Sequence, residues 1–139
     1  MDGNSLVWVF GMFKLLIIDD EASIRFSIQK VFQRDAVQVF TAENRRDGLA
    51  LFGSESPDVV LLDICLGSES GLELFDEIRQ IDAKCPVIFI TGHGTVDMAI
   101  DATARGAFDY LIKPLDVDRL KQVVERGFTA NRLTQVPRA

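Results

Sequence analysis

Residues 13–21 read Phe-Lys-Leu-Leu-Ile-Ile-Asp-Asp-Glu, an almost continuous apolar run that ends in three acidic residues. Such an unbroken run is typical of a parallel strand covered on both faces, whereas a strand with one solvated face alternates. Four more short apolar runs follow, at residues 37–40, 59–62, 87–90 and 108–112. The sequence therefore predicts five strands.

The stretches between these runs have the three- and four-residue spacing of amphipathic helices. A helix around residues 44–52 is the least regular of them, because Gly48 lies inside it. The residues predicted to face the core from the other four helices are Ile24, Ile28, Val31 and Phe32; Leu74, Phe75 and Ile78; Val96, Ala99, Ile100 and Thr103; and Val117, Leu120 and Val124. Alternating strands and helices predict an α/β fold, a three-layer doubly wound five-stranded parallel sheet, with the common strand order 2-1-3-4-5.

Composition limits the function classes. A chain of 139 residues fits one domain, and its net charge of −6 argues against a domain that grips nucleic-acid phosphates. Cys65 and Cys85 are too few for a disulfide framework, which favours a reducing, cytoplasmic location. The longest apolar stretch, residues 6–18, is interrupted by Lys14 and is too short to span a membrane.

Acidic residues stand where two neighbouring strands are predicted to end. Asp19 and Asp20 follow the first strand and Asp63 ends the third, and these strands adjoin where the strand order reverses. Carboxylates at this turn exclude the glycine-rich phosphate loop of a dinucleotide binder. Three close carboxylates cannot all stay ionised without a cation, and an all-oxygen site favours Mg²⁺. There are two alternatives. Asp19 and Asp20 could cap the N-terminus of the following helix, or the three carboxylates could share one proton without a metal.

Two more polar residues end strands of the same sheet. Thr91 offers a hydroxyl donor and Lys113 a point charge, which together can hold an oxyanion. Taken singly, each is more often an ordinary strand or surface residue. Their joint position at the strand ends favours a functional site.

With these residues the chain resembles the receiver domain of two-component response regulators, the flavodoxin-like module typified by the chemotaxis protein CheY. The resemblance covers about residues 14–128. It matches the acidic pair to Asp19 and Asp20, the phosphoacceptor to Asp63, the switch hydroxyl to Thr91, the switch aromatic to Tyr110 and the active-site lysine to Lys113. Residues 91–100 and 106–114 are similar to the receivers of NtrC-type enhancer-binding regulators, which act with the alternative sigma factor sigma-54.

The resemblance implies a function. A sensor histidine kinase, or a small acyl phosphate, would donate a phosphoryl group to Asp63 with Mg²⁺ held by Asp19, Asp20, Asp63 and the backbone carbonyl of Cys65. Thr91 and Tyr110 would then switch the face made by the fourth helix, the fifth strand and the fifth helix, which can also form a homodimer, to control an output such as transcription. In the family, positions equivalent to Cys65 and His93 tune dephosphorylation. Such a domain is a signalling module with self-catalysed chemistry rather than an enzyme.

The family pattern also implies boundaries. Residues 1–12 are predicted to be an N-terminal extension or expression leader, residues 13–130 the receiver, and residues 131–139 a linker or tail, with the effector domain missing from this chain. Gly67 stands where the family often has proline, which predicts a more mobile loop. Met98 and Ala102 are predicted to lie outside the core stripe of their helix, as a partner surface or as ordinary surface apolarity.

Two other functions stay open. A Mg²⁺-dependent phosphohydrolase could use Asp63 as its nucleophile, but such enzymes commonly place a second carboxylate two residues later, where this chain has Cys65. A receiver that no longer accepts phosphate could act as a binding module, although the complete set of site residues argues against this.

Overall fold

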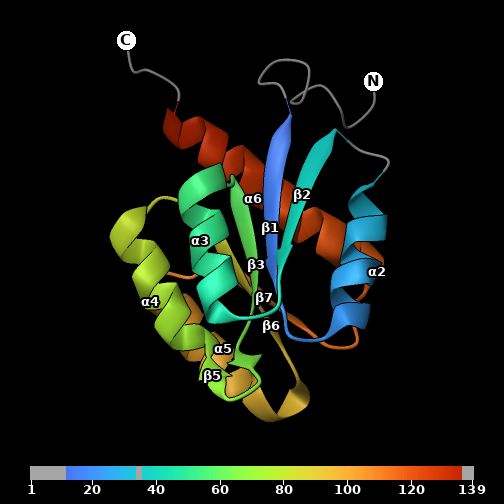
Figure 1. Cartoon of the computed structure of the whole chain (residues 1–139). Coiled ribbons are helices and arrows are strands. Elements are labelled where there is room, and N and C mark those ends of the chain that lie inside the picture. The colour runs from blue at the N-terminus through green and yellow to red at the C-terminus, as the bar shows by residue number, and fades with distance from the viewer. Residues whose placement is uncertain (1–11, 34–35, 136–139) are drawn as a thin grey trace.

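A computed structural model describes residues 12–33 and 36–135 of the chain (Figure 1). Five parallel strands form the main sheet: β1 (Phe13–Ile18), β2 (Val37–Ala42), β3 (Val59–Asp63), β6 (Val87–Thr91) and β7 (Asp109–Ile112). Their order across the sheet is β2-β1-β3-β6-β7, which confirms the predicted order 2-1-3-4-5. The register pairs Ile18 of β1 with Leu62 of β3, so these two strands end side by side.

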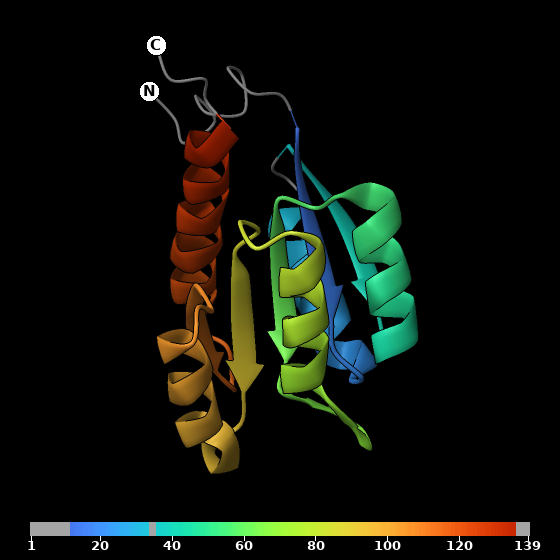
Figure 2. The same cartoon turned by 90° about the vertical axis from the view of Figure 1, so that its left-hand side faces the viewer.

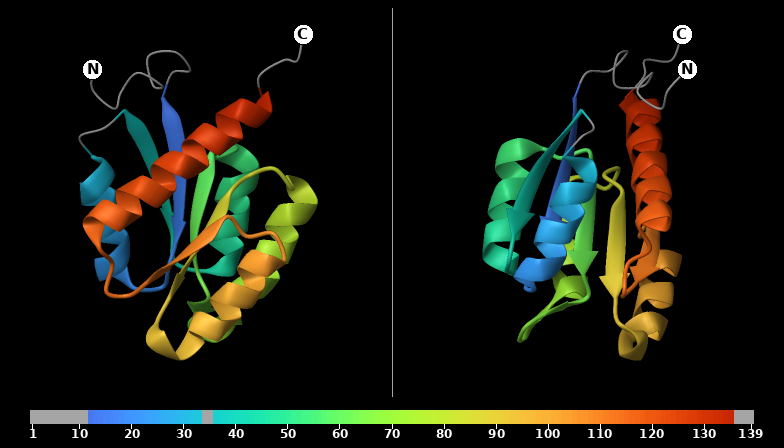
Figure 3. Two further views of the ribbon diagram at one scale, coloured as in Figure 1. Left: turned by 180° about the vertical axis from the view of Figure 1, so that it is seen from behind. Right: turned by 90° about the vertical axis from the view of Figure 1, so that its right-hand side faces the viewer.

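Helices cover both faces of the sheet, as Figures 2 and 3 show. The helices are α2 (Ala22–Phe32), α3 (Arg45–Glu55), α4 (Gly71–Ile81), α5 (Val96–Ala104) and α6 (Val117–Gln135), with a short 3₁₀ helix at His93–Thr95. Helices α2 and α6 share one apolar core with the sheet, and α3, α4 and α5 share the other. Because successive strand side chains enter opposite cores, the apolar runs need no polar alternation.

The predicted core faces are correct for α4 and only partly correct for α5 and α6, since Val117 of α6 is exposed although Leu120 and Val124 are buried. Leu74, Phe75 and Ile78 are buried. In α5 the buried residues are Ala99 and Ala102, so the prediction that Ala102 lies outside the core stripe is wrong, and Ile100 is exposed. The helix packs with its small residues against the sheet, which leaves the larger Met98 and Ile100 side chains at the surface.

Two features of the structure were not predicted from the sequence, and one predicted segment lies outside the described residues. A hairpin of two short strands, β4 (Cys65–Leu66) paired with β5 (Glu69–Ser70), follows β3. Helix α6 continues past the predicted domain boundary at residue 130. The predicted extension falls, apart from Met12, outside the described residues.

Among the helices of the described part, none combines the length and apolar character that a membrane span requires.

Helix α4 begins in close contact with the strand that carries Asp63. The amide of Gly71 donates to the carbonyl of Ile64 at 2.7 Å. A Cβ atom at Gly71 would lie 2.1 Å from the carbonyl oxygen of Asp63, so this position has no room for a side chain.

We predict that Gly71→Ala lowers the free energy of unfolding by roughly 2–4 kcal/mol, because backbone atoms of β3 must move to admit a methyl group. The matched control is Gly53→Ala on helix α3, where a Cβ meets nothing within 4 Å. The control is expected to be neutral or stabilising by up to about 1 kcal/mol. Urea unfolding of both variants measures this, and equal stability of the two would contradict the close-packing argument.

Candidate functional site

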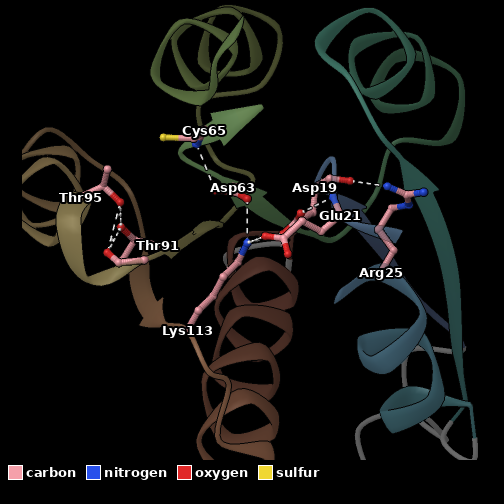
Figure 4. Close-up of polar contacts among 9 residues, drawn as sticks. Asp19, Glu21, Arg25, Asp63, Cys65, Thr91, Thr95 and Lys113 are labelled. Atoms are coloured by element: carbon pink, nitrogen blue, oxygen red, sulfur yellow. Dashed lines mark hydrogen bonds and ion pairs between the residues drawn. The ribbon is translucent and has the colours of Figure 1, made fainter. Parts of the chain in front are cut away.

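Four polar residues lie along the carboxyl-terminal edge of the sheet. Asp19 follows β1, Asp63 ends β3, Thr91 ends β6, and Lys113 follows β7. The main-chain amide of Lys113 donates to the carbonyl of Thr91 at 2.8 Å, which fixes where the lysine leaves the sheet. Figure 4 shows the Lys113 side chain extending toward the carboxylates of Asp63 and Asp19.

The ammonium group of Lys113 contacts three carboxylates. Its Nζ atom lies 2.9 Å from Asp63 Oδ2, 3.2 Å from Asp19 Oδ2 and 2.7 Å from Glu21 Oε1. Burial alone lowers the pKa of Lys113, but the hydrogen bonds to Glu21 and Asp63 and the charges of the carboxylates outweigh it and raise the pKa. Lys113 therefore stays protonated and holds the carboxylates together.

Asp19 is the most enclosed of the carboxylates. Burial, reinforced by the negative charge of Asp63, raises its pKa to about 6, although the amide of Glu21 and the ammonium of Lys113 both lower it. Its Oδ1 atom accepts from the Glu21 amide at 2.8 Å. The buried Oδ2 atom has no hydrogen bond within the described part of the chain, despite its ion-pair contact with Lys113.

The carboxylate oxygens of this edge can hold a divalent cation. One oxygen each from Asp19, Asp20, Glu21 and Asp63 lies within 4.8 Å of the others. The donors are all hard oxygens, two of the residues are exposed to water, and Asp19 offers a buried oxygen without a hydrogen bond. This donor set fits Mg²⁺, which prefers carboxylates and retained water molecules.

The loop after β3 is shaped around Asp63. Asp63 Oδ1 accepts from the amide of Cys65 at 3.0 Å, and the exposed Cys65 side chain belongs to the unpredicted hairpin. Gly67 adopts a φ of +63°, a left-handed conformation that proline cannot adopt. Proline therefore could not replace Gly67 in this turn, and a Cβ there would lie 3.8 Å from Asp20 Oδ2.

Thr91 lies at this edge but its hydroxyl is engaged elsewhere. The residue is fully buried, and its Oγ1 atom donates to the carbonyl of Gly92 at 3.1 Å and shares a hydrogen bond with the hydroxyl of Thr95. In Figure 4 this threonine pair stands apart from the carboxylates and Lys113. Tyr110 of β7 is half-buried against the same core as α5, and His93 is exposed in the 3₁₀ helix.

Sequence reasoning missed three residues of this region. Glu21 binds Lys113, Arg25 donates to the carbonyl of Asp19 at 2.6 Å, and Thr95 bonds Thr91. Glu21 adjoins the acidic pair, so its charge was a usable signal. Arg25 and Thr95 carry no such signal, because an arginine in a helix and a threonine in a loop are common surface residues.

Residues 15–125 match the family model described as the response regulator receiver domain. The chain is 38% identical to the DNA-binding transcriptional regulator NtrC of Salmonella typhimurium over 97% of its own length, and 34% identical to sporulation initiation phosphotransferase F of Bacillus subtilis over 81%. It covers 27% of the first protein and 91% of the second. The chain spans about a quarter of the length of the first relatives it matches, the regulatory protein AtoC of Escherichia coli and NtrC.

Solved structures agree with these relatives. The chain resembles the crystal structure of a response regulator receiver domain protein from Clostridium thermocellum, with a TM-score of 0.83 and 35% sequence identity. The match covers 88% of this chain and 99% of that one, so the similarity extends over the whole sheet and its helices.

The buried charge of Asp19 predicts a pH-dependent stability. Because the pKa of Asp19 in the folded chain lies above its ordinary value of 3.8, ionising the carboxyl opposes folding. That cost is absent below about pH 4 and complete above about pH 7, since the unfolded chain loses the proton first.

Asp19→Asn should remove this cost while keeping the Oδ1 acceptor for the Glu21 amide. Without divalent metal, we expect its free energy of unfolding to exceed that of the wild type by roughly 1–3 kcal/mol near pH 7.5, with a smaller difference near pH 4.5. Chemical denaturation in EDTA at both pH values tests this. A variant less stable than the wild type at both would show that Asp19 supports the fold.

Proposed function

The chain belongs to the response regulator receiver domain family, and from that premise we propose that Asp63 is its phosphoacceptor. The observation that carries the proposal is the contact of Lys113 Nζ with Asp63 Oδ2 at 2.9 Å, inside a cluster of carboxylates that fits Mg²⁺. Lys113 also contacts Asp19 and Glu21, and the family pattern assigns the phosphoacceptor role among these three carboxylates to Asp63. Phosphoryl transfer depends mainly on such positioning and charge compensation.

The chemistry follows from these positions. A carboxylate oxygen of Asp63 attacks the phosphorus of a phosphohistidine or of a small acyl phosphate, and the leaving group departs with the electron pair of the broken bond. Asp19, Asp20, Asp63 and the backbone carbonyl of Cys65 would hold Mg²⁺, which would supply charge neutralisation for the phosphoryl oxygens. Lys113, already protonated and beside Asp63, holds one of these oxygens. Water later hydrolyses the acyl phosphate, so both steps are self-catalysed by the domain.

Thr91 is proposed to read out the phosphorylated state. Its hydroxyl now bonds Gly92 and Thr95, and it would have to leave them to donate to a phosphoryl oxygen on Asp63. A charge-assisted bond of this kind contributes roughly 1.5–3 kcal/mol, enough for a ten- to hundredfold shift between two conformations. Tyr110, half-buried on the neighbouring strand, would turn inward as Thr91 moves.

The output surface is proposed to be the face formed by α5, β7 and α6. Four large apolar side chains are exposed there: Met98, Ile100, Ile112 and Val117. Exposed apolar side chains on one face suit a protein partner or a second copy of the chain. The partners proposed are a sensor histidine kinase and, because relatives such as NtrC are transcriptional regulators, an effector domain outside this chain that controls transcription.

The proposed boundaries and location follow the family as well. We take residues 13–130 as the receiver and the remainder of α6 as the start of a connection to further sequence. The absence of direct nucleic-acid binding agrees with the net charge of −6, and a cytoplasmic location agrees with the free cysteines Cys65 and Cys85. Phosphomonoester hydrolysis is the competing function, and the exposed Cys65 two residues after Asp63 supplies no carboxylate for it.

We predict that acetyl phosphate labels Asp63 only when Mg²⁺ is present, adding one phosphoryl group to the intact mass. Asp63→Asn is expected to remain unlabelled, and Lys113→Met to label at least tenfold more slowly because the transferring oxygens lose their cation. Asp58→Asn is the matched control, since Asp58 lies at the opposite end of β3 and binds the amide of Lys14. Equal labelling of the wild type and Asp63→Asn would refute the assignment, and turnover of phosphomonoesters would favour the hydrolase.

Cys65 and His93 should set the lifetime of the phosphorylated state. Both side chains are exposed, two residues after Asp63 and Thr91 respectively, and we propose that they flank the path of the hydrolytic water. We expect Cys65→Ala and His93→Ala to change the decay rate several-fold while the melting temperature stays within a few degrees. Unchanged decay in both variants would reject this role.

A further inference from the structure

Arg25 contacts the acidic turn from outside the proposed site. It is the fourth residue of α2, and its Nη1 atom donates to the main-chain carbonyl of Asp19 at 2.6 Å (Figure 4). Its Nη2 atom lies 4.0 Å from Glu43, which follows the end of the neighbouring strand β2. The side chain is only 19% exposed, so the contact is sheltered from water.

The position of Arg25 is unfavourable for the helix alone. A positive charge in the first turns of a helix opposes the helix dipole, and the first turn of α2 holds no acidic residue to offset it. The Glu21 side chain makes no capping hydrogen bond there. Because helical side chains tilt toward the N-terminus, Arg25 can nevertheless reach back to the turn that precedes the helix.

With this contact, three of the four polar atoms of Asp19 form hydrogen bonds, and within the described residues the fourth, Oδ2, makes only an ion-pair contact. Its amide donates to the carbonyl of Ala42 at 3.1 Å, its carbonyl accepts from Arg25, its Oδ1 accepts from the Glu21 amide, and its Oδ2 faces Lys113. The carbonyl of Asp19 belongs to the peptide group that joins it to Asp20. Holding that oxygen therefore fixes the orientation of the peptide plane between the two acidic residues.

We propose that Arg25 is a positioning residue that holds the Asp19–Asp20 peptide so that both carboxylates are ready to bind a divalent cation. The proposal rests on the proposed Mg²⁺ site and adds a residue to it that does not touch the metal. Residues that orient metal ligands in this way typically contribute ten- to a hundredfold to metal affinity.

The sign of the effect separates this role from a purely electrostatic one. Removing a positive charge near a cation site would by itself tighten Mg²⁺ binding, because a repulsive charge is lost. Releasing the peptide plane would weaken Mg²⁺ binding, because the carboxylates must then be ordered when the ion binds. Arg25→Met thus has opposite outcomes under the two explanations.

The test is calorimetric titration of Mg²⁺ into the full chain of the wild type, Arg25→Met, Arg25→Lys and Lys30→Met. We expect Arg25→Met to weaken Mg²⁺ binding roughly tenfold. Arg25→Lys should weaken it less, because lysine keeps the positive charge but lacks the planar guanidinium group. Lys30→Met removes the same charge from α2, where Lys30 lies over the ring of Phe26, and should leave the affinity unchanged. Equal or tighter binding by Arg25→Met overturns the proposal, whereas a wild type that binds no Mg²⁺ overturns the proposed function itself.

A second measurement needs no metal. In EDTA, amide hydrogen exchange of Glu21, which donates to Asp19, should accelerate at least tenfold in Arg25→Met, whereas exchange of Leu61 in the buried strand β3 should not. Equal acceleration of both amides would mean that the substitution only destabilises the fold, and would also overturn the proposal.

Discussion

The arrangement of the site depends on one half-buried lysine among carboxylates. Lys113 brings its ammonium group to Asp63, Asp19 and Glu21, which come from two different strand ends. This is possible only because β1 and β3 are neighbours and because β7 ends at the same edge of the sheet. One ammonium group cannot balance four carboxylates, so the fold maintains an excess of negative charge at this edge.

That excess links stability to function. Burying the ionised Asp19 carboxylate costs free energy of folding, and its raised pKa reflects this cost. Its Oδ2 atom makes no hydrogen bond within the described residues. A chain selected for stability alone would replace such a group by an amide or an apolar residue. A divalent cation would remove both the repulsion among the carboxylates and the free-energy cost of burying ionised Asp19. The proposed chemistry and the cost to stability therefore have one physical origin.

The sequence predicted the sheet and the main acidic residues because each depends on a strong local signal. Short apolar runs such as residues 59–62, separated by helical stretches, are typical of strands covered on both faces, and polar residues at the ends of parallel strands then lie at one edge. The hairpin at Cys65–Ser70 escaped prediction because strands of two residues have no measurable periodicity. Ala102 was misplaced because apolar residues occur all around α5, and only packing decides which side faces the sheet. The partners of Thr91 and the reach of Arg25 depend on tertiary geometry that spacing does not encode.

The central claim is that the carboxylates at this edge are arranged for a divalent cation. The most direct measurement is the melting temperature of the wild-type chain near pH 7.5 in EDTA and in millimolar Mg²⁺ at matched ionic strength. The account predicts a rise in melting temperature that grows with Mg²⁺ concentration, because an ion that binds only the folded chain stabilises it. A melting temperature that does not change with Mg²⁺ would contradict it.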